Sequence, residues 1–334
     1  HMQQMTRKEP AENAQLDVVA LGELLVDFTA QAVDSWGFPV MAAHPGGAPA
    51  NFLAAAAKFG ASAAMVGKVG DDAFGRLLKS TLDKAGIDSR GVVLDPEVFT
   101  TLAFVTLDGH GERSFSFARK PGADTCLDFG EVELALLDRT RVFHFGTLSL
   151  TQEPARSATV QAVAYAKDHG ALVTFDPNLR KPLWKNLEDA RQAMRWGLDQ
   201  ADVVKISEEE VEFLFGLGPE EGVNAILEAF PVSLVFVTCG ANGCCYGNAN
   251  GAGSVPGLTG LPVVDTTGAG DIFGGSAIWK LLQLGKTPGA LSARQMREIA
   301  AFACASASLS TTKPGGISSV PEYEQVLARM GEIG

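Results

Sequence analysis

The stretch DTTGAGD at residues 265–271 lies between the apolar run 261–264 and a long helical pattern. Its small residues let the backbone approach an anion closely, and the free N–H groups at the start of the helix would point toward that anion. Asp271 then places a carboxylate beside the anion site, where it could accept the proton of a hydroxyl that attacks a phosphoryl group. A helix start stabilised by an acidic residue is the alternative interpretation of the same residues.

Short apolar runs rich in β-branched residues alternate with amphipathic stretches along most of the chain. The runs predict strands at residues 16–21, 63–69, 141–145, 171–175, 202–206 and 234–238. The amphipathic stretches predict helices at residues 52–59, 154–169, 187–200, 208–215, 269–284 and 293–309. This alternation is typical of an α/β fold whose mostly parallel sheet is covered by helices on both faces.

Two segments, 28–45 and 99–119, break this alternation. Both read as strands and hairpins, and the second has a period-two pattern around the turn DGHG at residues 108–111, so we expect a small accessory sheet. Neither a repeat nor a long linker divides residues 16–330, which predicts a single domain. Residues 1–15 are polar and begin with the His-Met pair typical of a cloning scar, which predicts a disordered tail.

The composition excludes several classes of function. The 334 residues are 46% hydrophobic, enough for one large domain or two small ones, and their net charge is −12. We therefore expect no nucleic-acid partner and no membrane partner, because no cluster of Lys and Arg is present to meet a polyanion. Five cysteines without CxxC spacing predict a reducing cytoplasm rather than a disulfide framework or a zinc site. No apolar run is long enough to span a bilayer.

Two stretches near the N-terminus carry polar groups suited to a sugar. In PGGAPAN at residues 45–51, paired glycines expose backbone N–H groups, and Asn51 offers both a donor and an acceptor. In GELLVD at residues 22–27, Asp27 comes soon after the first predicted strand, and the ends of parallel strands border the ligand crevice of such sheets. A turn before a helix and an exposed loop aspartate are the respective alternatives.

A third stretch, FDPNLRKPLW at residues 175–184, follows another predicted strand. Arg180 could neutralise phosphate charge with its planar guanidinium, while Asp176 and Asn178 fix the turn that presents it. Because the stretch contains two prolines, a stiff loop without a binding role is the alternative.

The stretch PGGAPAN, with Gly70 and Gly75 downstream, and the stretch DTTGAGD together resemble the two signatures of the ribokinase, or PfkB, family of sugar kinases. The resemblance extends from about residue 16 to about residue 321. Within the family, GELLVDF, TLAFVTL, GERSF and DPNLRKPLW are most similar to bacterial and plant fructokinases. The resemblance implies a ribokinase-like three-layer αβα sandwich, with segments 28–45 and 99–119 forming a β-sheet lid over the sugar pocket.

The resemblance also implies roles for named residues. Asp271 matches the catalytic base, and the anion hole matches Gly268, Ala269 and Gly270. The sugar-contacting positions match Asp27, Gly46, Gly47, Asn51 and Arg180. The nucleotide-binding positions match Lys205, Thr238, Gly240, Gly243 and Cys304.

Two metal ions are implied in the same way. Glu210 aligns with the glutamate of the family's NxxE motif, which organises Mg²⁺ and its waters, although Ser207 stands where that motif has Asn. A potassium ion behind the anion hole would be held at the matching positions Asp265, Thr267, Thr311 and Gly316.

The function predicted from these residues is transfer of the γ-phosphoryl group of MgATP to D-fructose, giving fructose 6-phosphate. A kinase for ribose or 2-keto-3-deoxygluconate is the alternative within the family. A catalytically silent sugar- or nucleotide-binding regulator is a third hypothesis, and the presence of Asp271 and of residues 268–270 argues against it. We also expect a cytoplasmic homodimer in which the apolar lids pack together, and activation by potassium.

Overall fold

A ten-stranded sheet crosses the centre of the molecule in the computed structural model, which describes residues 15–107 and 113–333. Its strands are β1 (Leu16–Leu21), β4 (Ala63–Gly70), β5 (Ile87–Asp88), β6 (Val92–Asp95), β9 (Thr140–Gly146), β10 (Leu172–Asp176), β11 (Val203–Ser207), β12 (Leu234–Thr238), β13 (Cys244–Asn248) and β14 (Gly251–Val255). The strands follow the order β14-β13-β12-β11-β10-β9-β1-β4-β5, and β6 pairs with β4. Neighbouring strands are parallel except at one edge, where β13 pairs antiparallel with both β12 and β14. The predicted, mostly parallel sheet is confirmed.

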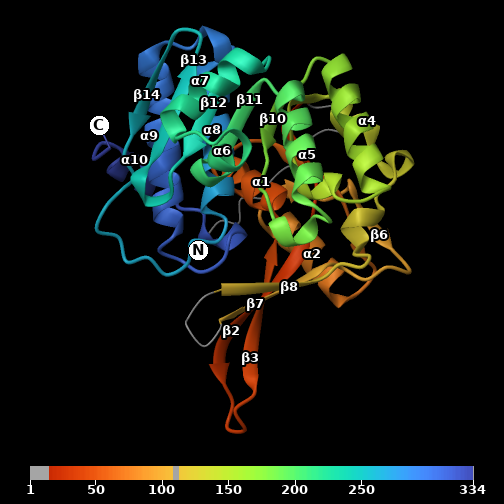
Figure 1. Cartoon of the computed structure of the whole chain (residues 1–334). Coiled ribbons are helices and arrows are strands. Elements are labelled where there is room, and N and C mark those ends of the chain that lie inside the picture. Colours follow the sequence, from red (N-terminus) through yellow and green to blue (C-terminus); the bar gives the residue numbers. More distant parts are fainter. Residues whose placement is uncertain (1–14, 108–112, 334) are drawn as a thin grey trace, which may run out of the picture.

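Helices cover both faces of this sheet (Figure 1). They are α1 (Ala48–Lys58), α2 (Ala73–Lys84), α3 (Leu134–Asp138), α4 (Ala155–Asp168), α5 (Leu187–Gln200), α6 (Glu208–Phe215), α7 (Pro219–Ala229), α8 (Ala269–Leu284), α9 (Ala293–Ser310) and α10 (Tyr323–Met330). Short 3-10 helices lie at Ala123–Cys126, Phe129–Glu131, Leu148–Leu150, Lys181–Leu183, Gly240–Asn242, Pro288–Ala290 and Ile317–Ser319. Within the part of the chain that the structure describes, no helix is long and apolar enough to cross a membrane.

Two hydrophobic clusters, one on each face, hold the three layers together. The side chains of β12 alternate between them: Leu234 and Phe236 join the cluster with α1, α8 and α9, while Val235 and Val237 join the cluster with α4, α5 and α7. Side chains of a strand point to opposite faces in turn, so a strand that is apolar at every position must be covered on both sides. This is why uninterrupted apolar runs in the sequence predict the central strands well.

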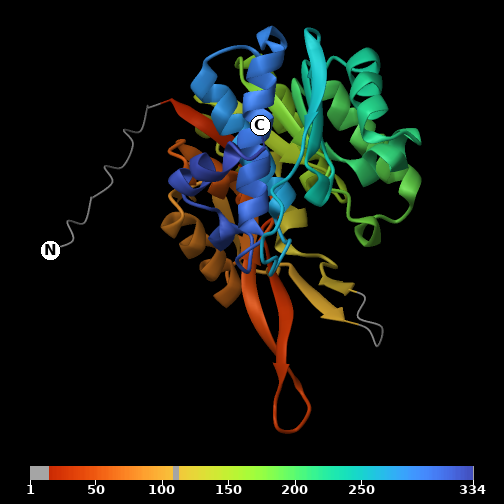
Figure 2. The same cartoon turned by 90° about the vertical axis from the view of Figure 1, so that its left-hand side faces the viewer.

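A second, four-stranded sheet extends from the edge of the body (Figures 1 and 2). Its order is β3-β2-β7-β8, with β2 (Leu25–Val33), β3 (Pro39–Gly46), β7 (Leu102–Leu107) and β8 (Arg113–Ala118). The predicted accessory sheet is therefore present, whereas the predicted turn at 108–111 and the tail at 1–14 lie outside the described residues. The hairpin formed by β2 and β3 carries exposed apolar side chains, including Trp36 at 83% and Phe38 at 65% exposure.

A buried ion pair fixes the small sheet to the body. Arg119, directly after β8, donates from Nη2 to Asp124 Oδ2 at 2.8 Å and to the Leu148 carbonyl at 2.9 Å. The hydroxyl of Thr101, directly before β7, donates to the same Asp124 carboxylate. Both charged side chains are 2% exposed or less, so each depends on its partners for the hydrogen bonds that water would otherwise supply. The base of the small sheet is thus held at a defined position beside the central sheet.

Candidate functional site

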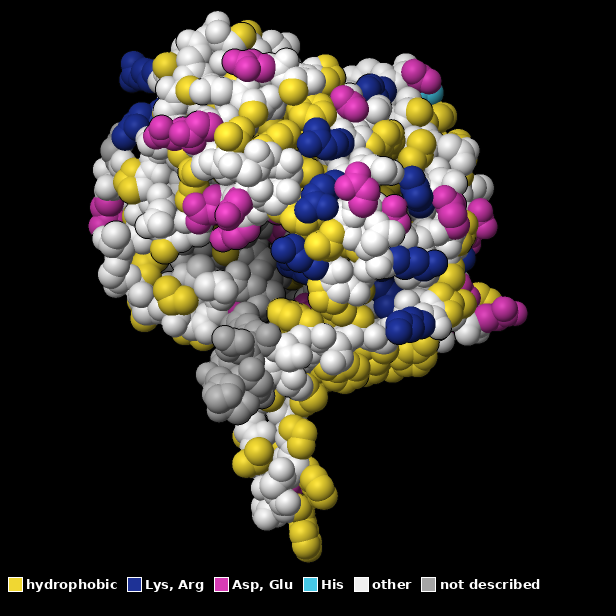
Figure 3. Space-filling view, in the orientation of Figure 1, with side chains coloured by type: hydrophobic (Ala, Val, Ile, Leu, Met, Phe, Trp, Pro, Cys, Tyr) yellow, Lys and Arg dark blue, Asp and Glu magenta, His cyan; other side chains and the backbone are white. Residues whose placement is uncertain are grey.

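A cavity of about 960 Å³ opens where the small sheet meets the central sheet and the starts of α1 and α8. Figure 3 shows a hollow in this face of the molecule, with Lys and Arg side chains along one border. The cavity lining brings together predicted residues from segments far apart in the chain, namely Asp27, Gly46, Gly47, Asn51, Arg180, Lys205, Glu210, Asp265, Thr267, Gly268, Ala269, Gly270, Asp271 and Gly316.

The start of α8 forms one wall of the cavity. Gly268 is the residue before the helix, and its φ of 76° lies in the left-handed region that favours glycine. A Cβ atom there would also lie 3.0 Å from Asn51 Nδ2 and 3.1 Å from the Gly316 Cα, so the position has no room for a side chain. The helix has no side-chain cap, and the Ala269 N–H donates to the Thr266 carbonyl at 3.2 Å, so it is the next N–H groups of the first turn that an anion can reach.

Asp271 lies in the first turn of α8 and lines the same cavity. Burial raises the pKa of its carboxyl group, while Lys205 and the hydrogen bond from Asn51 oppose the rise. A carboxyl group with a raised pKa in a cleft is suited to accept a proton, which a purely structural helix-start aspartate has no need to do.

Lys205 lies beneath this helix start. Its Nζ is 3.2 Å from Asp176 Oδ2, and a Cβ at position 270 would lie 2.7 Å from that Nζ. Burial raises the pKa of Asp176 to about 7, an effect that Lys205 opposes. Burial disfavours the charge on Lys205 as well, but the neighbouring carboxylates outweigh it, and the pKa of Lys205 is raised. The lysine therefore places a positive charge directly behind the glycine-rich loop.

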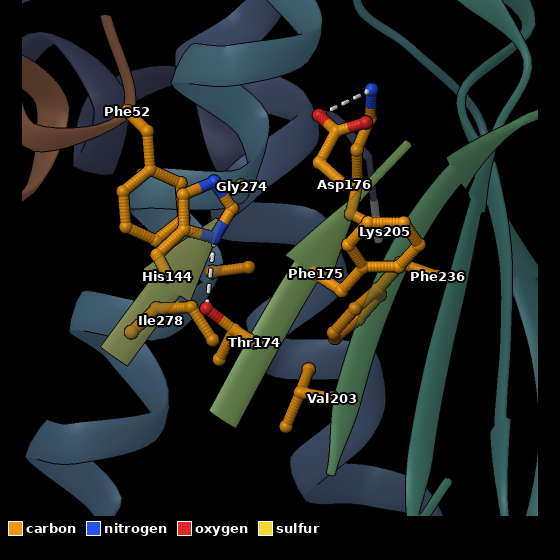
Figure 4. A pocket seen from close by; sticks show the side chains of 11 residues that line it. Phe52, His144, Thr174, Phe175, Asp176, Val203, Lys205, Phe236, Gly274 and Ile278 are labelled. Atoms are coloured by element: carbon orange, nitrogen blue, oxygen red, sulfur yellow. Dashed lines mark hydrogen bonds and ion pairs between the residues drawn. The ribbon is translucent and has the colours of Figure 1, made fainter. Parts of the chain in front are cut away.

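A packed layer supports Lys205 and Asp176 from below, around a small cavity of about 10 Å³ (Figure 4). His144 stacks on Phe52 with ring centroids 3.7 Å apart, and its Nδ1 lies 2.8 Å from Thr174 Oγ1. Burial lowers the pKa of His144 to about 3, so the imidazole is neutral near pH 7. This histidine is a core residue.

The small sheet contributes Asp27 to the cavity. Asp27 lies within β2 opposite His44 of β3, and not in a loop at the end of β1 as its place in the sequence suggested. Burial raises the pKa of its carboxyl group to about 6, while Arg180 and His44 oppose the rise. A Cβ at position 46 would lie 2.6 Å from Asp27 Oδ2, so Gly46 leaves room for this carboxylate.

Glu23 is a cavity residue that the sequence analysis missed. It is 3% exposed, and its Oε1 accepts a hydrogen bond of 3.1 Å from the backbone N–H of Ala48, the first residue of α1. Burial raises the pKa of Glu23 to about 7. One signal could have found it: Gly47, the residue before α1, has no side chain to cap the helix, so an acceptor must come from elsewhere.

The loop after β10 presents Arg180 at the cavity. Asn178 has a φ of 45°, and its N–H donates to Asp176 Oδ1 at 3.1 Å, which is the predicted turn. The side chain of Arg180 is exposed, and its Nη1 donates to the adjacent Leu179 carbonyl at 3.3 Å.

Glu210 connects this loop to β11. Its Oε2 accepts the Leu179 N–H at 2.7 Å, and its Oε1 accepts the Ser207 N–H at 2.9 Å, while Ser207 caps α6 in return. Each carboxylate oxygen has a second acceptor site, so a water molecule can also bind there. Ser207 stands where the NxxE motif has Asn, and in this chain it caps the start of α6.

Four predicted nucleotide residues and one predicted potassium residue lie outside the cavity lining: Thr238, Gly240, Gly243, Cys304 and Thr311. Gly240 and Gly243 form the turn between β12 and β13, with φ of 54° and 89°. Cys304 is 3% exposed on α9, where it adjoins Cys244 in the core. For Gly240 and Gly243 the structure gives turn geometry as a reason for the residue type, and for Cys304 it gives packing.

The loop before α8 is tied to the segment after α9. Asp265 Oδ1 accepts the Thr267 N–H and Oδ2 accepts the Gly315 N–H, both at 2.9 Å. The Thr311 carbonyl accepts two backbone N–H groups, and the Gly316 carbonyl accepts both the N–H and the hydroxyl of Ser319. Among residues 15–107 and 113–333, no group of three or more His, Cys, Asp or Glu side chains is arranged to hold a metal ion.

A family model described as pfkB family carbohydrate kinase matches residues 15–323. Fructokinase-1 of Oryza sativa subsp. japonica is 44% identical over 317 residues, which cover 94% of this chain and 97% of the relative. A fructokinase from Xylella fastidiosa with bound ATP superimposes with a TM-score of 0.86 at 32% identity, covering 95% of this chain and 98% of the other.

A further solved structure, fructokinase from Vibrio cholerae O395 in a form with bound fructose, ADP and calcium ion, gives a TM-score of 0.80 at 33% identity. It covers 94% of this chain and 98% of its own. The likeness therefore extends over nearly the whole chain.

The contacts of Glu210 predict a stability effect. Replacing it with Ala leaves the buried N–H groups of Leu179 and Ser207 without their acceptor, so the free energy of unfolding should fall by about 2–4 kcal/mol. Glu209→Ala, in the same helical turn but exposed, is the matched control and should change it by less than about 0.5 kcal/mol. Urea unfolding without nucleotide or metal checks both, and equal stability of the two variants would contradict the structural role.

Proposed function

The chain belongs to the pfkB family of carbohydrate kinases, and on that basis we propose that it is an ATP-dependent fructokinase that converts D-fructose to fructose 6-phosphate. The observation that carries the proposal is a half-buried carboxylate, Asp271, beside a helix start without a side-chain cap in a large cavity. The relative from rice and the solved structures from Xylella fastidiosa and Vibrio cholerae are all fructokinases, which supports fructose over other sugars.

In the proposed mechanism, Asp271 accepts the proton of the attacking sugar hydroxyl as that oxygen bonds to the γ-phosphorus. The bond from phosphorus to the bridging oxygen of ADP breaks in the same in-line transfer, and no covalent enzyme intermediate forms. The backbone N–H groups of Gly268, Ala269 and Gly270 stabilise the charge that develops on the phosphoryl oxygens. Lys205 adds a positive charge behind that loop.

The sugar half of the cavity is formed by Asp27, Gly46, Gly47, Asn51 and Arg180. Carboxylate and amide groups there can accept and donate hydrogen bonds to several hydroxyls at once. Glu23 and Asp27 both line this region. Asp27, with a pKa of about 6, is mostly ionised near pH 7 and disfavours a sugar acid such as 2-keto-3-deoxygluconate, whereas Glu23, with a pKa of about 7, adds only part of a charge.

ATP is the proposed phosphoryl donor, and Mg²⁺ would bind with it. Mg²⁺ in kinases is held largely by phosphate oxygens and waters, so the metal would arrive with the nucleotide. The remaining acceptor sites of Glu210 would hold its waters. When bound, the metal would neutralise phosphate charge. Thr238, Gly240, Gly243 and Cys304 stay proposed for the adenosine side.

Potassium activation stays a prediction, and its ligand set has only partial support. Each of the Thr311 and Gly316 carbonyls already accepts two hydrogen bonds, which use both acceptor sites of a carbonyl oxygen. The geometry at Asp265 and Thr267 is compatible with a loop that a cation would order. Equal turnover in potassium and in tetramethylammonium buffers would remove the proposal, whereas a severalfold higher turnover in potassium would support it.

We further propose that the chain works as one cytoplasmic kinase unit whose small sheet acts as a lid. The hydrophobic cluster on each face of the central sheet contains residues from both halves of the chain, which supports a single folded domain. Closure of the lid would exclude water that could otherwise take the phosphoryl group. All five cysteines are free thiols, which supports a reducing compartment.

A homodimer is the proposed assembly, with the lid as its interface. Val33, Trp36, Phe38 and Val40 are exposed on the hairpin of the small sheet, an apolar surface that a second copy could cover. Light scattering at micromolar concentration should give about twice 35.1 kDa, and Trp36→Ser should shift the mass toward the monomer. Leu327→Ser, an exposed apolar position on α10, should not. A monomeric wild-type protein would contradict the dimer.

The catalytic assignment predicts the effect of Asp271→Asn. The amide keeps the shape of the side chain but is not a base, so kcat should fall about 10²- to 10⁴-fold with little change in the KM for fructose. Asp189→Asn in the first turn of α5, outside the cavity lining, is the control and should keep normal turnover. A helix-start role alone predicts a loss of about 1 kcal/mol in stability and a near-normal kcat for Asp271→Asn. Measuring kcat and the thermal midpoint on one preparation separates the two.

A further inference from the structure

The amide of Asn51 contacts the carboxylate of Asp271 directly. Asn51 Nδ2 donates to Asp271 Oδ2 at 3.0 Å, although the two residues are 220 positions apart in the chain. Asn51 lies in the first turn of α1, where its own N–H donates to the Gly47 carbonyl at 3.1 Å. The starts of α1 and α8 therefore meet through this one side-chain hydrogen bond.

The packing around Asn51 fixes the plane of its amide. A Cβ at position 316 would lie 2.3 Å from Asn51 Oδ1, and a Cβ at position 268 would lie 3.0 Å from Asn51 Nδ2. Both neighbours are glycines, so their backbones approach the two ends of the amide closely. Asn51 is itself only 5% exposed, which leaves its side chain little freedom to move.

Only one of the two amide orientations is compatible with an ionised Asp271. In the observed orientation the N–H faces the carboxylate, and the buried Oδ1 has no hydrogen-bond partner among the described residues. A rotation by 180° would place two acceptor oxygens against each other in a water-poor site. The structure leaves Oδ1 unsatisfied and directs the donor to Asp271, which is the arrangement that favours a negative charge on that carboxylate.

We propose that Asn51 is a positioning residue for Asp271: it orients the carboxylate and favours its ionised form before the sugar arrives. This role is separate from the sugar contact assigned to Asn51 and rests on the proposed function of Asp271 as the base. Because Nδ2 holds Asp271 Oδ2, the other carboxylate oxygen is left for the attacking hydroxyl. The unpartnered Asn51 Oδ1 remains available to accept a donor from a ligand.

The charges around Asp271 decide how strongly this hydrogen bond matters. The groups that act on its ionisation are Asp27 of β2, Asp176 of β10, Arg180 of the loop after β10, Lys205 of β11 and Glu210 of α6. Burial and the carboxylates favour protonation, whereas Lys205, Asn51 and Arg180 favour the ionised form. Removing the Asn51 donor therefore raises the pKa of Asp271, and the active ionised form is lost at a higher pH than in the wild type.

The test uses Asn51→Leu, which has a similar shape and no donor, and Asn51→Ser, which keeps a small polar group if the leucine variant does not fold. With saturating fructose and MgATP, kcat should fall about 10- to 100-fold, and the acid limb of its pH profile should move to higher pH. Asp27→Asn is the matched control from the same cavity. The change removes a proposed acceptor for a sugar hydroxyl, so the KM for fructose should rise. It also removes a negative charge that favours protonation of Asp271, so the acid limb should not move to higher pH.

A second readout is independent of the sugar. The protonation of Asp271 can be followed in the free protein by carbon-13 NMR of labelled aspartate, with the signal assigned by its loss in Asp271→Asn. The pKa should be higher in both Asn51 variants than in the wild type. An unmoved Asp271 pKa in a folded Asn51 variant would overturn the proposal, and so would an unmoved acid limb with only the KM changed. If the wild type does not phosphorylate fructose but the NMR shift is present, the fructokinase assignment fails and the positioning role stands.

Discussion

A half-buried carboxylate at the start of a helix is the constraint on which the rest of the proposed site depends. As the proposed base, Asp271 would need few water molecules around it, but desolvation raises its pKa and disfavours the charge that a base requires. The surrounding residues offset that cost in three ways: the helix start, the amide of Asn51 and the ammonium group of Lys205. The fold brings these groups together from α1, α8 and β11, which no local segment could do.

The same site collects more negative than positive charge. Asp27, Asp176, Glu210 and Asp271 lie around it, and burial raises the pKa of three of them. Lys205 and Arg180 are the basic groups that act on Asp271, so the carboxylates of the site are only partly balanced by positive charge from the protein. Binding of a metal with the nucleotide would supply positive charge, and this explains why a site for an anionic substrate can contain so many carboxylates. The oxygens of Glu210 accept hydrogen bonds from two backbone N–H groups.

The sequence predicted most of the fold because its strands are apolar on both faces. The runs at 16–21 and 234–238 coincide with β1 and β12, and the helices 187–200, 208–215 and 269–284 coincide with α5, α6 and α8. The strand pair β13 and β14 was missed, because Gly and Cys make up much of it and its pattern is weak. The run 261–264 is apolar yet lies outside any strand, with Val263 and Val264 each 62% exposed.

Prediction of the site was less complete for a different reason. Asp271 and Gly268 could be found because a helix start with small residues is a local pattern. Glu23 was missed, because the uncapped helix start after Gly47 indicates only that an acceptor is needed, and the bond of Glu23 to Ala48 depends on how the segment after β1 packs against α1. Cys304 and Thr238 were expected near a nucleotide from alignment alone, and the cavity lining does not include them. Local sequence thus identifies groups at element ends, whereas the contacts between elements need the tertiary structure.

The central claim is that this arrangement of side chains phosphorylates fructose. The most direct measurement is ADP release by the wild-type protein with MgATP and, in turn, fructose, ribose, glucose, adenosine and 2-keto-3-deoxygluconate, with the sugar phosphate identified by mass spectrometry. The account predicts that fructose gives the highest kcat/KM, by at least about tenfold, and that the product is a fructose monophosphate. ADP release that does not depend on fructose, or a clear preference for another member of the panel, would contradict it.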